Sequence, residues 1–236
     1  MKEIFISKTD DVAKIVLVEN GNIIEKYQEN DKVKRLEGKI YLGKVQNVLQ
    51  GMQAAFIDIG EEKNTFIHLK DILPKVDIVK NKDQLEEEKN IKKIVKIGDK
   101  LLIQVKRDGS NMKGPRVSTH ISLPSRYFVL MPDVEIKTIS QKIEKQDEKN
   151  RLTEIINEIV PKNFGVIVRT SAERKSKEEL EKDLLKSITQ WKEIKKIANN
   201  ENSKAPMCVY EGQSFIEKFL IDLIDKDIER IIVDNK

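Results

Sequence analysis

Hydrophobic and polar positions alternate through residues 38–73, and this alternation predicts three strands of a small barrel. In the run AAFIDI, at 54–59, three aliphatic residues fall on one side of the strand and Phe56 falls on the other. In the run FIHL, at 66–69, Phe66 likewise lies opposite the aliphatic residues. Because each strand already supplies its own apolar inward set, Phe56 and Phe66 are not required for the barrel core.

Two phenyl rings on the outer side of a barrel, close to basic residues, form a surface on which unpaired bases can stack. The alternative is that both rings are ordinary core residues, since apolar side chains in strands are more often buried than exposed. The strict alternation favours the stacking interpretation, and with it single-stranded RNA as the ligand.

Elsewhere the pattern predicts further strands, helices and one charged excursion. Asn20 and Gly21 both tolerate positive φ and predict a tight hairpin turn. Ser176 and Glu179 have capping-box spacing and predict the start of a long helix, in whose apolar face Trp191 is expected to be a core residue. The charged run 74–96 predicts a solvated insertion. Other strands are predicted over 3–7, 12–19, 22–28, 127–131, 163–169, 207–210 and 230–233, and other helices over 152–159 and 214–223.

The composition narrows the possible classes of protein only moderately. The chain has 236 residues, 36% of them charged, and a net charge of +4, which is too small to indicate nucleic-acid binding by itself. A single cysteine, Cys208, excludes an internal disulfide, and with only two histidines a Cys/His zinc site is not expected. No stretch has the length of a membrane span and the N-terminus lacks a signal-peptide pattern, so a cytoplasmic location without membrane contact is expected.

Several motifs resemble the ribonuclease E/G family of bacterial endoribonucleases. The phrases GMQAAFIDIG and TFIHL are similar to the family's RNA-binding barrel, an OB fold of the type named after a small-subunit ribosomal protein. KGPRVSTHISLPSRYFVLMP, GVIVRT and WKEIKK follow in the family's order, so that the resemblance covers residues 4–235.

The resemblance implies an α+β fold with several subdomains. A five-stranded OB-fold barrel over 38–123 and an α/β 5′-sensor module over 124–204 would both be inserted into an RNase H-like subdomain split between 1–37 and 205–236. From the pattern alone, a linear string of three domains is also possible. Neither end has enough strands and helices for a core of its own, which favours the split arrangement.

Arg169 and Thr170, at the end of the strand GVIVRT, form a candidate phosphate site. A guanidinium offers a planar fork of donors to phosphate oxygens, and a hydroxyl and unpaired backbone amides in the turn 171–173 can complete the cradle. The resemblance implies that these two residues hold the 5′-monophosphate of RNA. It also implies that Val129 packs against the terminal nucleotide. Ser125 replaces the family's glycine, which would strain the turn if positive φ is needed there and be harmless if only its N–H is used.

The resemblance also implies which residues on the barrel surface contact RNA. Phe56, Phe66 and Lys113 match the family's RNA-contacting platform, and Arg107 stands at a matching basic position. Ile59 replaces a family tyrosine, which leaves one stacking partner fewer. Arg116 would add salt-sensitive attraction for phosphate groups.

Cleavage itself is not expected from these residues. In the family, Mg²⁺ is held by aspartates of a deoxyribonuclease-I-like subdomain and a structural Zn²⁺ links protomers into oligomers, and both elements come after the part matched here. We therefore expect the RNA-recognition part of such an enzyme, without cofactors of its own and with 5′-monophosphorylated single-stranded RNA as the preferred partner. The alternatives are a complete small Mg²⁺-dependent nuclease, and a protein-docking module that uses the Trp191 helix.

Overall fold

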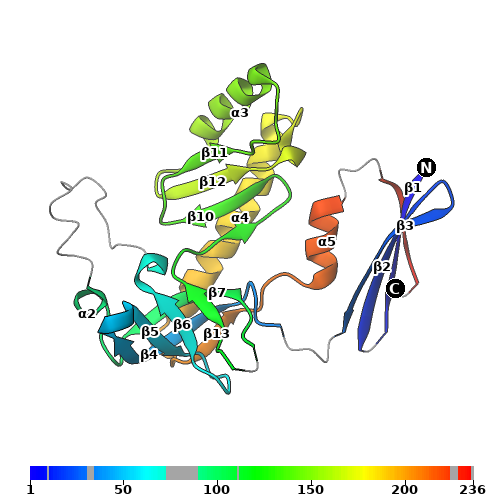
Figure 1. The fold of residues 1–236 in the computed structure, drawn as a ribbon. Helices are drawn as coiled ribbons and strands as arrows, with labels where there is room; N and C mark the ends of the chain where they lie inside the picture. The colour runs from blue at the N-terminus through cyan, green and yellow to red at the C-terminus, as the bar shows by residue number, and fades with distance from the viewer. Residues whose placement is uncertain (10, 31–34, 73–89, 111, 224–227, 235–236) are drawn as a thin grey trace. The chain divides into compact units, whose positions relative to one another are not determined.

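Residues from both ends of the chain build one compact unit, and the residues between them build a second (Figure 1). This computed structural model describes residues 1–9, 11–30, 35–72, 90–110, 112–223 and 228–234. The first unit comprises Met1–Arg35 with Gln213–Lys236, and the second comprises Leu36–Gly212. These limits differ from the domain boundaries implied above after residues 37 and 204, and the identity of each domain stays a prediction.

The first unit is a four-stranded sheet with one helix packed on it. The strand order is β14–β1–β2–β3, and β14 runs parallel to β1. Asn20 (φ 51°) and Gly21 (φ 80°) form the predicted turn between β2 and β3. Alternate residues of β1 and β2 pack against Phe219 of the helix because strand side chains alternate between the two faces. The elements are β1 (Lys2–Lys8), β2 (Val12–Glu19), β3 (Asn22–Asn30), α5 (Phe215–Leu223) and β14 (Ile228–Val233).

A closed five-stranded barrel forms the first part of the second unit. Its strands follow the order β4–β5–β6–β8–β7, and β7 closes the barrel by pairing with β4. Strands β6 and β8 are parallel and the other pairs are antiparallel, which is the mixed topology of an OB fold. The elements are β4 (Ile40–Leu49), β5 (Ala54–Asp58), β6 (Thr65–His68), β7 (Lys100–Arg107) and β8 (Arg116–Ser118), with short helices η1 (Gln50–Met52), η2 (Leu69–Asp71) and α2 (Ile91–Ile94). Most of the predicted charged insertion, its residues 74–89, lies outside the described residues.

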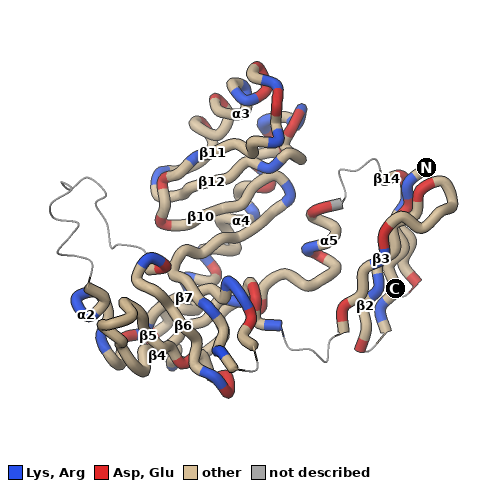
Figure 2. Tube along the Cα trace, viewed as in Figure 1, with Lys and Arg blue, Asp and Glu red and all other residues tan. Residues whose placement is uncertain are grey.

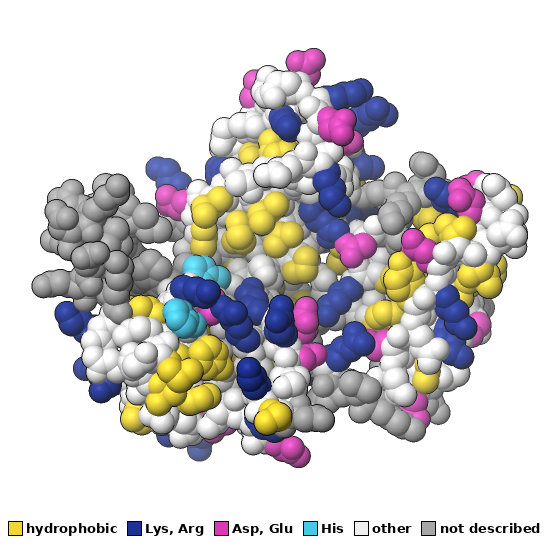
Figure 3. Space-filling view, in the orientation of Figure 1, with side chains coloured by type: hydrophobic (Ala, Val, Ile, Leu, Met, Phe, Trp, Pro, Cys, Tyr) yellow, Lys and Arg dark blue, Asp and Glu magenta, His cyan; other side chains and the backbone are white. Residues whose placement is uncertain are grey.

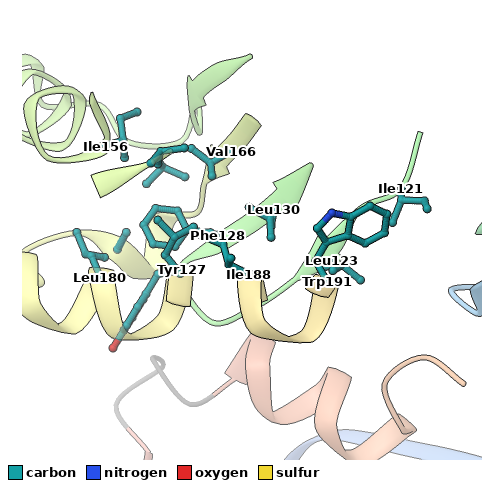
Figure 4. Packing of buried hydrophobic residues seen from close by; sticks show 14 of the residues in the cluster. Ile121, Leu123, Tyr127, Phe128, Leu130, Ile156, Val166, Leu180, Ile188 and Trp191 are labelled. Atoms are coloured by element: carbon teal, nitrogen blue, oxygen red, sulfur yellow. The ribbon is translucent and has the colours of Figure 1, made fainter. Parts of the chain in front are cut away.

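An α/β module follows the barrel, as expected. Its sheet has the order β11–β12–β10–β9, and two helices pack on it. The longer helix begins at the predicted capping box of Ser176 and Glu179, and Trp191 is buried with 5% of its surface exposed. Figure 4 shows Trp191 beside Leu123 in this core. The elements are β9 (Leu123–Pro124), β10 (Phe128–Pro132), β11 (Lys137–Ile139), α3 (Gln146–Ile159), β12 (Phe164–Val168), η3 (Thr170–Ala172) and α4 (Lys177–Ala198).

The first four residues of strand β4, 40–43, are buried on both faces of the strand. Ile40 and Leu42 belong to the core of the α/β module, whereas Tyr41 and Val45 belong to the core of the barrel. Strand β13 (Met207–Tyr210) adds to the outer edge of β4. This strand therefore pairs with the barrel, although the implied domain boundary placed it with the C-terminal segment. The barrel and the module are consequently one body, and the α+β fold with an OB barrel and an α/β module is confirmed.

Candidate nucleic-acid interface

Phe56 and Phe66 lie side by side on the outer side of the barrel. They are direct partners across β5 and β6, and their ring centroids are 6.1 Å apart at an interplanar angle of 65°. Both side chains are partly exposed, while the residues that alternate with them, Ala55, Ile57 and Ile67, form the barrel core. The predicted division of the two strand faces is confirmed. Two partly exposed rings held edge to face in this way offer an aromatic surface on which a base can stack.

Basic residues continue the row that begins with the two rings. Phe66 pairs with Arg116 of β8, and Arg116 pairs with Arg107 of β7. Arg116 donates from Nε and Nη2 to Asp71, at 3.2 and 2.8 Å. The sequence pattern did not reveal this pairing, which neutralises part of the positive charge beside the platform. Arg107 is exposed at the end of its strand.

Lys113 lies in the loop between β7 and β8, with its side chain exposed. The loop is closed by two backbone hydrogen bonds between Ser110 and Lys113, and Lys63 donates to the carbonyl of Ser110 at 3.2 Å. A Cβ on Gly114 would stand 2.0 Å from the carbonyl oxygen of Asn64, so this position requires glycine. The loop thus packs on the turn that precedes β6, close to Phe66.

A buried polar cluster joins the barrel to the α/β module. Gln104, only 4% exposed, donates to the carbonyls of Gly38 and Ser122 and accepts from the Ser122 N–H at 2.9 Å. Lys106 donates from Nζ to Gln104 Oε1 at 2.6 Å and to Ser122 Oγ at 3.1 Å. Burial lowers the pKa of Lys106 to about 8. Sequence reasoning missed Lys106. The pattern that could have revealed it is the spacing of two between Gln104 and Lys106, which places both side chains on the outer side of the same barrel strand.

Both histidines lie close to this cluster. The side chain of His68 accepts a hydrogen bond from the N–H of Lys70 at 3.2 Å. The side chain of His120 also bonds to the backbone of Lys70. Burial and the positive charge of Lys106 lower the pKa of His120. Figure 3 shows the two histidines among Lys and Arg side chains, between a hydrophobic patch over the barrel and another over the module.

Arg169 lies at the end of β12, where its backbone and side chain are both anchored. Its N–H donates to the carbonyl of Tyr127 at 2.8 Å, and Nη1 donates to the carbonyl of Ser125 at 3.0 Å. Thr170 is exposed at the start of η3. The N–H groups of Ala172 and Glu173 donate to the carbonyls of Arg169 and Thr170. The expectation that amides in this turn are unpaired is therefore wrong for these two residues.

The backbone of Ser125 is not left-handed: among the described residues, Ser125 is not one of those with positive φ. Its N–H donates to the carbonyl of Phe128 at 2.7 Å, and its hydroxyl donates to Asp183 of α4 at 2.7 Å. Asp183 also accepts from the N–H of Tyr127 at 2.9 Å. The replacement of glycine at this position therefore causes no backbone strain, and the serine hydroxyl ties the turn to α4.

Val129 lies on the outer face of the module sheet. It pairs with Ile167 of β12 on one side and with Pro124 of β9 on the other. Val129 is partly exposed and Ile167 is 38% exposed, whereas their neighbours Phe128 and Val168 point into the core. Arg169 follows Ile167 at the same strand parity, so an apolar strip leads directly to its guanidinium.

The loop after Arg169 and Thr170 is braced by an ion pair from α3. Arg151 donates from Nε and Nη2 to Glu148 at 2.8 and 2.6 Å, and from Nη1 to the carbonyl of Lys175 at 2.9 Å. Glu148 also accepts from the N–H of Arg174 at 2.8 Å. These bonds, with the side-chain bond from Arg151 the largest cause, lower the pKa of Glu148 to about 2. Acidic and basic residues both lie along this helix (Figure 2).

The structure thus brings the predicted residues together in two groups within one unit. Phe56, Phe66, Arg107 and Lys113 belong to the barrel, and Ser125, Val129, Arg169 and Thr170 surround one end of the module sheet. Among the described residues, no group of three His, Cys, Asp or Glu side chains is placed to hold a metal ion. No helix in the described ranges is long and apolar enough to cross a membrane.

Comparison with known proteins identifies the class to which this fold and these two groups belong: the chain is a member of the ribonuclease E/G family. The sequence model of the Ribonuclease E/G family matches residues 122–236. Ribonuclease G of Escherichia coli is 33% identical over 238 residues, which covers 99% of this chain and 48% of that protein. Ribonuclease E of a Nostoc species is 37% identical over 199 residues, or 84% of this chain and 28% of that protein. The chain spans about half the length of the ribonuclease G relatives it matches.

Proposed function

We propose that this chain recognises single-stranded RNA for a ribonuclease of the E/G type in RNA processing and decay. The observation that carries the proposal is the pair of partly exposed rings, Phe56 and Phe66, on a barrel whose core is complete without them. The names of the relatives, ribonuclease G and ribonuclease E, support RNA as the ligand.

The two rings form the platform, on which unpaired bases stack. Each stacked base contributes about 1–3 kcal/mol and the contribution depends little on base identity, so the platform binds many sequences. Arg107 and Lys113 are exposed on the same barrel and add phosphate contacts that weaken with salt. Arg116 contributes less to this attraction because it is paired with Asp71.

The pocket formed by Arg169, Thr170, Val129 and Ser125 receives a 5′-monophosphate. The backbone N–H of Arg169 donates to the carbonyl of Tyr127 and anchors the strand end, and the Nη1 bond to the carbonyl of Ser125 orients the guanidinium, so less side-chain entropy is lost when a phosphate binds. The hydroxyl of Thr170 is exposed beside it, and Val129 offers an apolar contact to the first nucleotide.

The binding test uses one 12-nucleotide RNA with either a 5′-monophosphate or a 5′-hydroxyl, measured by fluorescence anisotropy. Arg169→Ala is expected to weaken binding of the phosphorylated RNA about tenfold, because a charge-assisted bond contributes about 1.5–3 kcal/mol, and to leave the hydroxyl form nearly unchanged. Lys162→Ala, which removes an exposed charge before β12, is the matched control. Equal losses for both RNAs would show that Arg169 is not a 5′ sensor.

The platform is tested with the double variant Phe56→Ala, Phe66→Ala. Binding of both RNAs should fall at least tenfold, whereas Ile97→Ala, at a barrel residue that is 68% exposed, should change neither. Unchanged binding would favour the docking of another protein on this chain. Incubation of the chain with Mg²⁺ and the phosphorylated RNA tests the enzyme alternative: robust cleavage would assign catalysis to this chain as well as recognition.

A further inference from the structure

Lys106 is a partly buried cation with neutral partners. Its Nζ group donates to Gln104 Oε1 and Ser122 Oγ, so two of its three protons are used in bonds to described residues. No carboxylate in the described part of the chain forms a salt bridge with it. Asp71, the acidic group that acts on Lys106 at longer range, is already paired with Arg116. A buried charge with so little compensation favours an anion from outside.

The surroundings of Lys106 carry more positive than negative groups. Lys106 lies on β7 directly before Arg107, at the point where the register between β7 and β8 shifts. His120 is close enough for the charge of Lys106 to lower its pKa, and it is neutral above pH 7 for that reason and because of burial. The titratable and charged groups that face this place are Lys70 and Asp71 of η2, Arg107 of β7, Arg116 of β8, His68 and His120.

The position of this cluster is intermediate between the two binding groups. Arg116 pairs with Phe66 of the platform, and nine residues later Ser125 accepts from Arg169 in the pocket. His120 and Ser122 lie within this segment, and Ser122 is a partner of Lys106. A chain of nine residues spans at most about 30 Å, so a short RNA can reach both ends.

We propose that Lys106, with Arg116, binds an internal phosphate of the RNA strand whose bases stack on the platform and whose 5′ end occupies the Arg169 pocket. This inference rests on the proposed function. Lys106 supplies its third proton and its charge, Arg116 adds a positive charge that Asp71 partly neutralises, and His120 lies beside them with its side chain bonded to the backbone of Lys70. The phosphate replaces the missing counter-charge, and it raises the pKa of Lys106 on binding.

A consequence is that RNA binding takes up a proton near pH 8. Because the pKa of Lys106 in the free chain is about 8, the lysine is charged at pH 7 and largely neutral at pH 9. The affinity should therefore fall about tenfold between pH 7 and pH 9, since linkage allows at most a tenfold change per pH unit for one proton. The 5′-phosphate does not titrate in this range, because its second pKa is about 6.

The experiment measures the affinity of the full chain for a 5′-monophosphorylated 12-nucleotide RNA of adenine and cytosine at pH 7, 8 and 9 and constant salt. Lys106→Met should bind about tenfold more weakly than wild type at pH 7 and show no fall between pH 7 and pH 9. Its log affinity should also depend on log salt with a slope smaller by about 0.7. Lys106→Arg should keep the affinity at pH 9, and Lys100→Met, at an exposed lysine of the same strand, should keep the fall.

A second measurement needs no variant. Titration calorimetry of wild type at pH 8.5, in two buffers of different ionisation enthalpy, should reveal net proton uptake on RNA binding. Absence of uptake, or equal pH dependence in wild type and Lys106→Met while Phe56→Ala, Phe66→Ala still weakens binding, would overturn this inference alone. If the platform and Arg169 variants bind RNA as well as wild type, the proposed function fails instead.

Discussion

The ion pair of Glu148 and Arg151 should be the main electrostatic support of the loop that follows the Arg169 pocket. Arg174 in this loop has a φ of 60°, a left-handed conformation that costs about 1 kcal/mol for a residue other than glycine. Its N–H is held by Glu148, and the carbonyl of the next residue, Lys175, is held by Arg151. Glu148→Gln removes the charge and one acceptor oxygen while it preserves the size of the side chain.

The magnitude follows from the pKa of Glu148, which is lowered from 4.5 to about 2. At about 1.4 kcal/mol per pKa unit this difference corresponds to roughly 3 kcal/mol at neutral pH. The side chain of Arg151 is 37% exposed, and solvent screening reduces the expected loss of unfolding free energy to about 2 kcal/mol.

Trp191, the single tryptophan, makes the assay specific for the module, because it is buried in the same core as Leu152 and Ile156 of α3. Urea unfolding followed by its fluorescence should show Glu148→Gln about 2 kcal/mol less stable than wild type at pH 7. Glu154→Gln, at an exposed position of the same helix, is the control and should change the stability by less than about 0.5 kcal/mol.

The pH dependence of this stability difference tests whether it comes from the charge of Glu148. A carboxyl group whose pKa is lower in the folded chain stabilises it fully above pH 4.5, and this contribution disappears as the pH falls towards 2. The difference between wild type and Glu148→Gln should therefore shrink below pH 4.5. A difference that stays constant from pH 7 to pH 3, or no difference at pH 7, would refute the assignment of this stability to the charge of Glu148.

Two further predictions concern the barrel. Gln104→Leu should lower the unfolding free energy by about 2–4 kcal/mol in urea titrations, because it leaves the buried polar groups of Gly38 and Ser122 unpaired; a neutral effect would mean that water replaces the glutamine. Gly43→Ala should cost about 1–3 kcal/mol in thermal or urea unfolding, since its Cβ would stand 2.5 Å from Cγ2 of Ile57 and 3.0 Å from Cδ1 of Ile103. Wild-type stability of this variant would show that the barrel can widen at β4.

Strand parity, turn chemistry and capping signals were sufficient to predict much of this fold. The outward position of Phe56 and Phe66 follows from a period of two, and the start of α4 follows from the spacing of Ser176 and Glu179. These signals are local, so they are legible in a single sequence.

Contacts between distant segments were not predictable in the same way. Asp71 pairs with Arg116 across 45 residues, and Asp183 binds the turn at Ser125 across 58 residues. The pairing of β13 with β4 likewise depends on the closed barrel and leaves no periodic pattern. Lys106 was missed because a lysine in a strand is ordinarily solvated, whereas this one bonds to Ser122 of the segment between β8 and β9.

Side chains of β4 belong to the core of the barrel and to the core of the α/β module. This shared strand therefore holds the barrel platform and the Arg169 pocket at a fixed separation. An RNA that reaches both the platform and the pocket spends no binding free energy on bringing them together. Once it is bound at one of them, it binds the other at a high effective concentration, because their separation is fixed. The fixed separation therefore sets a minimum length for RNAs that bind tightly. Oligonucleotides shorter than this length would contact either the platform or the pocket, and longer ones would contact both.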